Sequence, residues 1–339
     1  MTTLSAGESH NLTLRRRAIL LSVCVGTALL IIKFLAAAFT GPAAILSDAL
    51  ESIINVVASV FAFYSITFSA QPPDRAHPYG HGKIESFSAG FEGALIILAA
   101  LAILWKAIPA FFTPLPLVQL DIGILLIVGT TVANALLGWL LIRAGKRTGS
   151  LALTADGTHV LTDVYTSIGV VIGLGLVAAT GWTILDPITA CVVAVNIIIS
   201  GVALIRQSVS HLLDTADEQV LQGIVDSLQH IRRPEWIDLH HLRSWSSGTQ
   251  HHIDFHLTLP RYWNLEQGHT AEAIISEWVV EHLGGQGEVL VHLDPCTSHH
   301  CRSCRLLECP VRDLPFRATL PWTVESAIGD PTLRTFAAD

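Results

Sequence analysis

Two pairs of metal-ligating side chains stand at helical spacing inside long apolar stretches. Glu51 and Asn55 are four residues apart, and so are His159 and Asp163. Residues four apart share one face of a helix, so each pair presents two donor atoms to the same point. Two such helices facing each other supply the four N and O ligands that a tetrahedral divalent metal requires. We interpret the four residues as a metal site.

Both pairs continue a longer polar stripe. Asp48 lies three residues before Glu51, and Asp156 lies three residues before His159. A carboxylate at membrane depth costs about 2.5–3.5 kcal/mol on insertion scales, which favours a functional role. Transporters place substrate sites at such repeated features near the bilayer midplane. The alternative is a pair of hydrogen-bonding stripes that only hold helices together, which Asn and Ser would do at lower cost.

The composition indicates an α-helical membrane protein. Hydrophobic residues make up 51% of the 339 residues and charged residues only 14%, too few charges for an ordinary soluble chain of this length. A transmembrane helix needs about 20 mostly apolar residues. We predict a segment 1–14, then a six-helix transmembrane domain over 15–210. Its helices are expected at about 15–37, 43–68, 86–112, 117–142, 152–180 and 184–208.

Basic residues alternate along the connections between these helices. The positive-inside rule therefore places both termini in the cytoplasm. The default expectation for the membrane of residence is a plasma or inner membrane. The connections at 40–41, 113–116 and 180–183 carry no Lys or Arg. The basic residues of the other connections are Arg15, Arg16, Arg17, Arg75, Lys83, Arg143, Lys146 and Arg147.

Residues 211–295 read as a separate α+β domain. Helical patterns at 217–230 and 265–283 flank strand patterns at 237–245 and 251–259, and a last strand follows at 288–293. The order is αββαβ, a small sheet covered by helices. The net charge of −8 and the missing basic patch argue against nucleic-acid binding.

The connection after the second span holds Asp74, His77 and His81, with Gly80 and Gly82 between and beside the histidines. Spacings of three and four residues with flexible glycines suit a divalent ion. A solvated loop with incidental histidines is the alternative.

Histidine is frequent in the part of the chain after position 210, where 12 of the 16 histidines lie. Which of these side chains converge is not fixed by the sequence.

Four cysteines crowd the segment 296–309 of the C-terminal tail, residues 296–339. Spacing of this kind, with a Cys-x2-Cys pair and flanking histidines, favours zinc, and redox-active thiols are the alternative. Beyond Cys304 the sequence has no clear periodicity, and we expect poor order over about the last twenty residues. The residues are Cys296, Cys301, Cys304 and Cys309, interleaved with His299 and His300.

The chain closely resembles the cation diffusion facilitator family of divalent-metal transporters, over nearly the whole of residues 14–296. The matching segments are SDALESIINVVAS, HPYGHGKIES, ADGTHVLTDVYTS, LDPITACVVAVNIIISG and EVLVHLDPC. The resemblance implies six spans, a cytoplasmic metallochaperone-like αββαβ domain, and a homodimer in the lipid bilayer that exchanges metal for protons. It also implies a transport site at Glu51, Asn55, His159 and Asp163, a loop site at Asp74, His77 and His81, and a cytoplasmic binuclear site at His240, His256, His269, His292 and Asp294.

One departure from the family concerns the second span. Zinc-transporting members usually carry Asp or His followed by Asp, whereas this chain has Glu51 and Asn55. Asn55 is a neutral, harder oxygen ligand, so we expect Fe²⁺, Mn²⁺, Co²⁺ or Cd²⁺ as further substrates. His159 still favours a borderline metal, and Zn²⁺ efflux is therefore the first expectation. The alternatives are an Fe²⁺, Mn²⁺ or Co²⁺ exporter and a membrane metal sensor that does not transport. An enzyme is not expected, because no HExxH, GxSxG or P-loop pattern occurs.

Overall fold

A computed structural model of the chain describes residues 6–40, 43–112, 121–285 and 287–330. Inside its helices, the side chains of residues 6–8, 36–40, 43–51, 121–127, 170, 174 and 178 lie outside this description. The contacts divide the chain into two compact units, with the boundary between Leu212 and Leu213. Each unit is described by itself.

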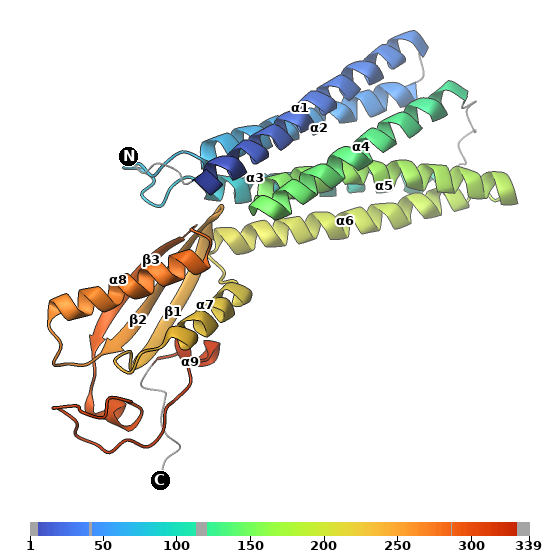
Figure 1. Cartoon of the computed structure of the whole chain (residues 1–339). Coiled ribbons are helices and arrows are strands. Elements are labelled where there is room, and N and C mark those ends of the chain that lie inside the picture. The colour runs from blue at the N-terminus through green and yellow to red at the C-terminus, as the bar shows by residue number, and fades with distance from the viewer. Residues whose placement is uncertain (1–5, 41–42, 113–120, 286, 331–339) are drawn as a thin grey trace. The chain divides into compact units, whose positions relative to one another are not determined.

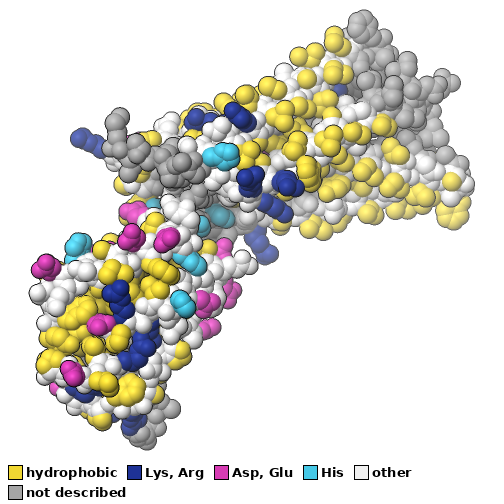
Figure 2. All heavy atoms as spheres, viewed as in Figure 1, with side chains coloured by type: hydrophobic (Ala, Val, Ile, Leu, Met, Phe, Trp, Pro, Cys, Tyr) yellow, Lys and Arg dark blue, Asp and Glu magenta, His cyan; other side chains and the backbone are white. Residues whose placement is uncertain are grey.

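The first unit is a bundle of long helices (Figure 1). Six helices in the described part are long and apolar enough to cross a membrane, which confirms the prediction of six spans. Their outward faces carry large apolar side chains such as Trp105, Val192 and Ile199, and Figure 2 shows this apolar surface. The helices are α1 (Ala6–Thr40), α2 (Ala43–Ser69), α3 (Lys83–Ala110), α4 (Asp121–Thr148), α5 (Leu151–Thr180) and α6 (Leu185–Leu212).

Helix α5 is the centre of the bundle, since it contacts each of the other five helices. Close approach to α4 depends on glycine: a Cβ added to Gly138 would stand 3.0 Å from the Gly157 carbonyl oxygen. Small residues let membrane helices pack backbone to backbone in this way. Ser150 caps the start of α5, and Gly181 ends it in the left-handed conformation, at φ 75°. Polar side chains on the inner face of α5, such as Asp156 and His159, are consequently buried.

The second unit has the predicted αββαβ order. Strands β1 and β2 are antiparallel, and β2 and β3 are parallel, so α8 forms the crossover that a parallel pair needs. Leu228, Phe255 and Ile275 lie in a core between the helices and one face of the sheet, which leaves the opposite face free for polar residues. The elements are α7 (Glu218–Ile231), β1 (Asp238–Ser247), β2 (Gln250–Leu259), α8 (Leu265–His282) and β3 (Gly287–Pro295).

The C-terminal tail differs from the expectation of poor order. Residues 296–330 fold back on the domain, with a 3-10 turn at Ser298–Arg302 and a short helix α9 at Val324–Ile328. Trp322 is only 4% exposed, and the Arg232 guanidinium stacks 4.1 Å from the centre of its ring. A few buried side chains such as Trp322 attach the tail to the domain, and no repeating apolar face does so. The sequence pattern therefore gave no sign that the tail is ordered. Residues 331–339 lie outside the described residues.

Candidate metal sites

Helices α2 and α5 bring three of the four predicted membrane ligands together. Asn55 bridges the other two. Asn55 Nδ2 donates to Asp163 Oδ2 at 2.7 Å, and His159 Nε2 donates to Asn55 Oδ1 at 2.9 Å. Glu51 belongs to α2 one helical turn before Asn55, but its side chain lies outside the described residues. The helical spacing that suggested a site thus does place N and O donors around one point.

The histidine of this membrane cluster is buried, whereas Asn55 and Asp163 are half-buried. His159 is 3% exposed, and its Nδ1 is buried without a hydrogen-bond partner. A cavity of about 30 Å³, enough for a water molecule or an ion, adjoins Asn55 and Asp163. Lys33 and Ser52 also line this cavity, and Lys33 Nζ donates to Ser52 Oγ at 2.9 Å. An imidazole, a carboxylate and an amide oxygen form a donor set for borderline divalent metals.

Two further carboxylates lie buried near the membrane cluster. Glu92 of α3 is 0% exposed, and neither of its carboxylate oxygens has a hydrogen-bond partner. Asp156 of α5, one turn before His159, is also 0% exposed, and it interacts electrostatically with Glu92. Ser59 Oγ donates to one Asp156 oxygen at 2.7 Å. The sequence analysis missed Glu92, although a carboxylate within an apolar span is itself a signal of function.

Glu85 at the start of α3 joins four helices through a buried network. It forms an ion pair with Arg15 of α1, and both side chains are less than a tenth exposed. Ser69 of α2 donates to one Glu85 oxygen at 2.7 Å, and Ser150 at the start of α5 donates to the other at 2.5 Å. Every Glu85 oxygen is thus satisfied, which indicates a structural clamp rather than a ligand site.

The connection between α2 and α3 does gather its three predicted ligands. One donor atom each from Asp74, His77 and His81 lies within 4.8 Å of the others. His81 Nε2 is 3.3 Å from Asp74 Oδ2 and 3.1 Å from His77 Nδ1. The backbone N–H of His77 donates to Asp74 and lowers the pKa of that carboxyl. The turn is possible because Gly80 adopts a left-handed φ of 81°.

On the open face of the sheet, histidines from three strands form a row. The strand register pairs His240 of β1 with His256 of β2, and His256 with His292 of β3. Asp294, two residues further along β3, completes the cluster: its Oδ2 lies 3.2 Å from His240 Nε2 and 2.9 Å from His256 Nδ1. His292 Nε2 is 3.4 Å from Asp294 Oδ1 and remains 65% exposed. We call His240, His256, His292 and Asp294 the sheet cluster.

His241 joins the sheet cluster, and the sequence analysis missed it. The strand register shifts between His240 and Arg243, and His241 there adopts a φ of 50°. Its ring centre consequently lies 5.0 Å from that of His256, instead of pointing to the opposite face as alternation would require. His269 does not belong to the cluster in this chain: its side chain is 77% exposed on α8 and lies 3.4 Å from Glu272.

Comparison with known proteins assigns both units to described domain families. Residues 19–213 match the family model described as the cation efflux transmembrane domain, and residues 216–296 match the cation efflux protein cytoplasmic domain. An uncharacterized transporter of Synechocystis sp. is 38% identical over 275 residues, which are 81% of this chain and 88% of that protein. The cation-efflux pump FieF of Citrobacter koseri is 29% identical over 282 residues, 83% of this chain and 93% of the pump.

Proposed function

Because the chain belongs to the cation diffusion facilitator family of cation efflux transporters, we propose that it exports Zn²⁺ in exchange for protons. The ion would bind between α2 and α5, at Asn55, His159 and Asp163, with Glu51 as the fourth ligand. The observation that carries the proposal is the pair of hydrogen bonds by which Asn55 links the buried His159 to Asp163.

Exchange with protons follows from the chemistry of these ligands. A metal ion requires a neutral imidazole and an ionised carboxylate, so binding and protonation compete at His159 and Asp163. Arriving metal would replace the hydrogen bonds that now join these groups through Asn55. Glu92, which is fully buried and has no hydrogen-bond partner on either oxygen, could carry a further proton, because burial disfavours the charged form of a carboxylate.

The cytoplasm is the proposed location of both termini and of the C-terminal domain. Lys and Arg residues on alternate connections support this orientation. The sheet cluster and the loop cluster of Asp74, His77 and His81 would then face the cytoplasmic metal pool. Metal bound there would neutralise carboxylates and favour association of the domains of a homodimer, so that the cargo also activates its own export.

Asn55 favours a second candidate, an exporter of Fe²⁺, Mn²⁺ or Co²⁺. A neutral amide oxygen lowers the negative charge of the site relative to a carboxylate, and harder ions accept oxygen ligands readily. A membrane sensor that binds metal without transporting it is the candidate from another class. It would use the sheet cluster and would show no flux.

The deciding experiment is Zn²⁺ and Fe²⁺ flux in proteoliposomes with an imposed pH gradient. Flux that requires the gradient and disappears in Asp163→Ala supports the proposal, and Asp186→Asn is the control for loss of a carboxylate elsewhere in the bundle. Asn55→Asp should raise the ratio of Zn²⁺ to Fe²⁺ flux. Flux that is independent of the gradient would refute antiport, and absence of flux from folded wild type would favour the sensor.

A further inference from the structure

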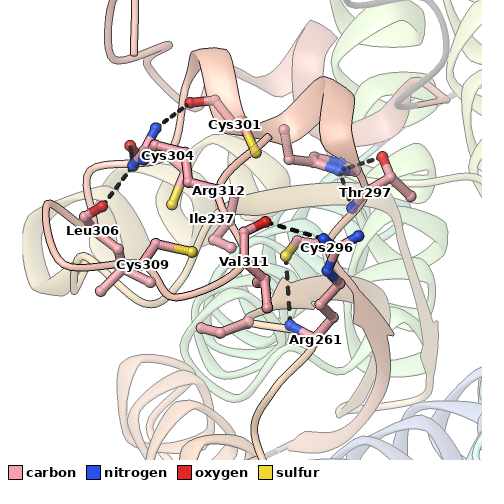
Figure 3. Close-up of a pocket in the computed structure, with 12 residues that line it drawn as sticks. Ile237, Arg261, Cys296, Thr297, Cys301, Cys304, Leu306, Cys309, Val311 and Arg312 are labelled. Atoms are coloured by element: carbon pink, nitrogen blue, oxygen red, sulfur yellow. Dashed lines mark hydrogen bonds between the residues drawn. The ribbon is translucent and has the colours of Figure 1, made fainter. Parts of the chain in front are cut away.

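The four cysteines of the tail surround one small cavity in the C-terminal unit (Figure 3). Its volume is about 10 Å³, close to the space that one water molecule needs. Arg261 and Arg312 also line it. In Figure 3 the labelled sulfurs lie around this space, although the residues span fourteen positions of a segment with little regular structure. The cysteines are Cys296, Cys301, Cys304 and Cys309.

The four thiols are shielded from solvent to different degrees and form no disulfide with one another. All four are free cysteines, so no disulfide accounts for their convergence. Cys301 and Cys304 are 8% and 6% exposed, and Cys296 and Cys309 are half-buried. The cytoplasmic location proposed above is a reducing compartment, where clustered cysteines more often bind metal than form disulfides.

Arg312 holds the loop in this shape. Its guanidinium donates to the carbonyl oxygens of Cys301 at 2.8 Å, Cys304 at 3.1 Å and Leu306 at 2.5 Å. On the other side of the cavity, the backbone N–H of Arg261 donates to Cys296 Sγ at 3.4 Å. The backbone that carries the cysteines is therefore fixed by hydrogen bonds, and its two arginines place positive charge where thiolates would form.

The neighbouring histidine is already engaged. His300 lines the same cavity, but its Nδ1 accepts a hydrogen bond from the backbone N–H of Thr297 at 3.0 Å, as part of the turn that starts at Ser298. A donor set of four sulfurs remains. Tetrahedral sites made only of thiolates, with a Cys-x2-Cys pair such as Cys301 and Cys304, are typical of structural zinc.

We propose that Cys296, Cys301, Cys304 and Cys309 bind one Zn²⁺ ion that fastens the tail to the end of the sheet. The site is chemically distinct from the N and O clusters proposed for cargo, since its ligands are soft thiolates and a site of four thiolates is the closed kind typical of structural zinc. In the described residues, three donors lie within 4.8 Å of one another only in the two His and Asp clusters. The sulfurs must therefore draw closer on binding, to reach Zn–S distances of about 2.3 Å.

A redox role for the four thiols is the competing interpretation. Zinc would displace the thiol protons as it binds.

Cobalt(II) titration of the reduced, metal-free full chain in detergent tests the proposal. Thiolate ligands give Co²⁺ an intense near-ultraviolet charge-transfer band that His and Asp ligands do not give. We expect this band in wild type and its loss on adding Zn²⁺. It should vanish in Cys296→Ser/Cys309→Ser, which alters the half-buried pair and spares the two buried cysteines. The matched control is Cys24→Ser/Cys191→Ser, in the membrane helices, which should keep the band.

The cobalt–thiolate band should also persist in Asp163→Ala, which would show that the cysteine site binds metal independently of the transport site. Absence of the band from wild type would overturn the proposal, and so would its survival in Cys296→Ser/Cys309→Ser. A disulfide among the four cysteines in protein alkylated inside cells would also overturn it, in favour of redox chemistry. Zinc analysis gives a second measure, with one ion fewer per chain in the tail variant than in the control.

Discussion

The membrane cluster and the sheet cluster use similar ligands on different supports. Each contains one nearly buried histidine, His159 at 3% and His240 at 4% exposed, but the sheet cluster also reaches solvent through His292, which is 65% exposed. An ion beside His159 and Asp163 would have to displace the hydrogen bonds that run through Asn55, whereas His292 is a ligand that already faces solvent.

The two clusters also differ in how their ligands are positioned. In the bundle, donors from α2 and α5 meet through side-chain hydrogen bonds across a helix interface. In the sheet, backbone register alone sets His240, His256 and His292 in a row. Substitutions should therefore cost most where a buried network loses a member, and least on the open sheet face.

The largest effect is expected from Glu85→Ala in the helix clamp. Removing Glu85 leaves Arg15 buried without a counter-charge, which should destabilise the bundle by about 3–5 kcal/mol. Thermal unfolding in detergent measures this loss. Arg16→Ala removes an exposed neighbouring charge and serves as the control. If Glu85→Ala and Arg16→Ala unfolded at the same temperature, the buried ion pair would contribute no more to stability than an exposed charge does, contrary to the expectation.

His159→Ala should reduce metal flux by more than about 100-fold, because even loss of a residue that only supports a ligand typically costs 10–100-fold in metal affinity. Metal binding to the sheet cluster should be unaffected. Proteoliposomes measure the metal flux, and calorimetric titration of the same preparation measures metal binding to the sheet cluster. If His159→Ala abolished both flux and binding, the two clusters would act as one site.

Asp294→Ala should weaken metal binding to the sheet cluster by about 10–100-fold, since its carboxylate contacts both His240 and His256. Asp254→Ala is a control on the neighbouring strand, because Asp254 pairs with Arg243 outside the cluster. Calorimetric titration with Zn²⁺ should show a lower affinity only in Asp294→Ala. Similar affinities in both variants would exclude Asp294 as a ligand.

The smallest effect is expected from His269→Ala. This side chain is 77% exposed and lies apart from the sheet cluster, so metal affinity of a single chain should change by no more than about twofold, as for ordinary surface substitutions. The same titration, run on protein at monomer concentrations, measures it. A tenfold loss would show that His269 reaches a metal after all.

Much of the fold could be predicted from sequence because its signals are local. Apolar length gave the six spans, and period-two alternation gave the strands. The spacing of Asn55, His159 and Asp163 was likewise sufficient to identify the membrane cluster. The tail could not be predicted in this way, because Trp322 is buried by a distant stacking contact with Arg232 rather than by a repeat in its own segment.

The sequence by itself determined the class of protein, the six spans, the αββαβ domain and the ligand types available for metal. Only the tertiary structure decided which ligands meet. His241 enters the sheet cluster through a register shift, His269 stays outside it, and Glu92 comes near Asp156 by the packing of α3 and α5. The physical reason is that helix and strand periodicity acts between neighbours in the chain. Convergence depends on register and packing between elements that are distant in it.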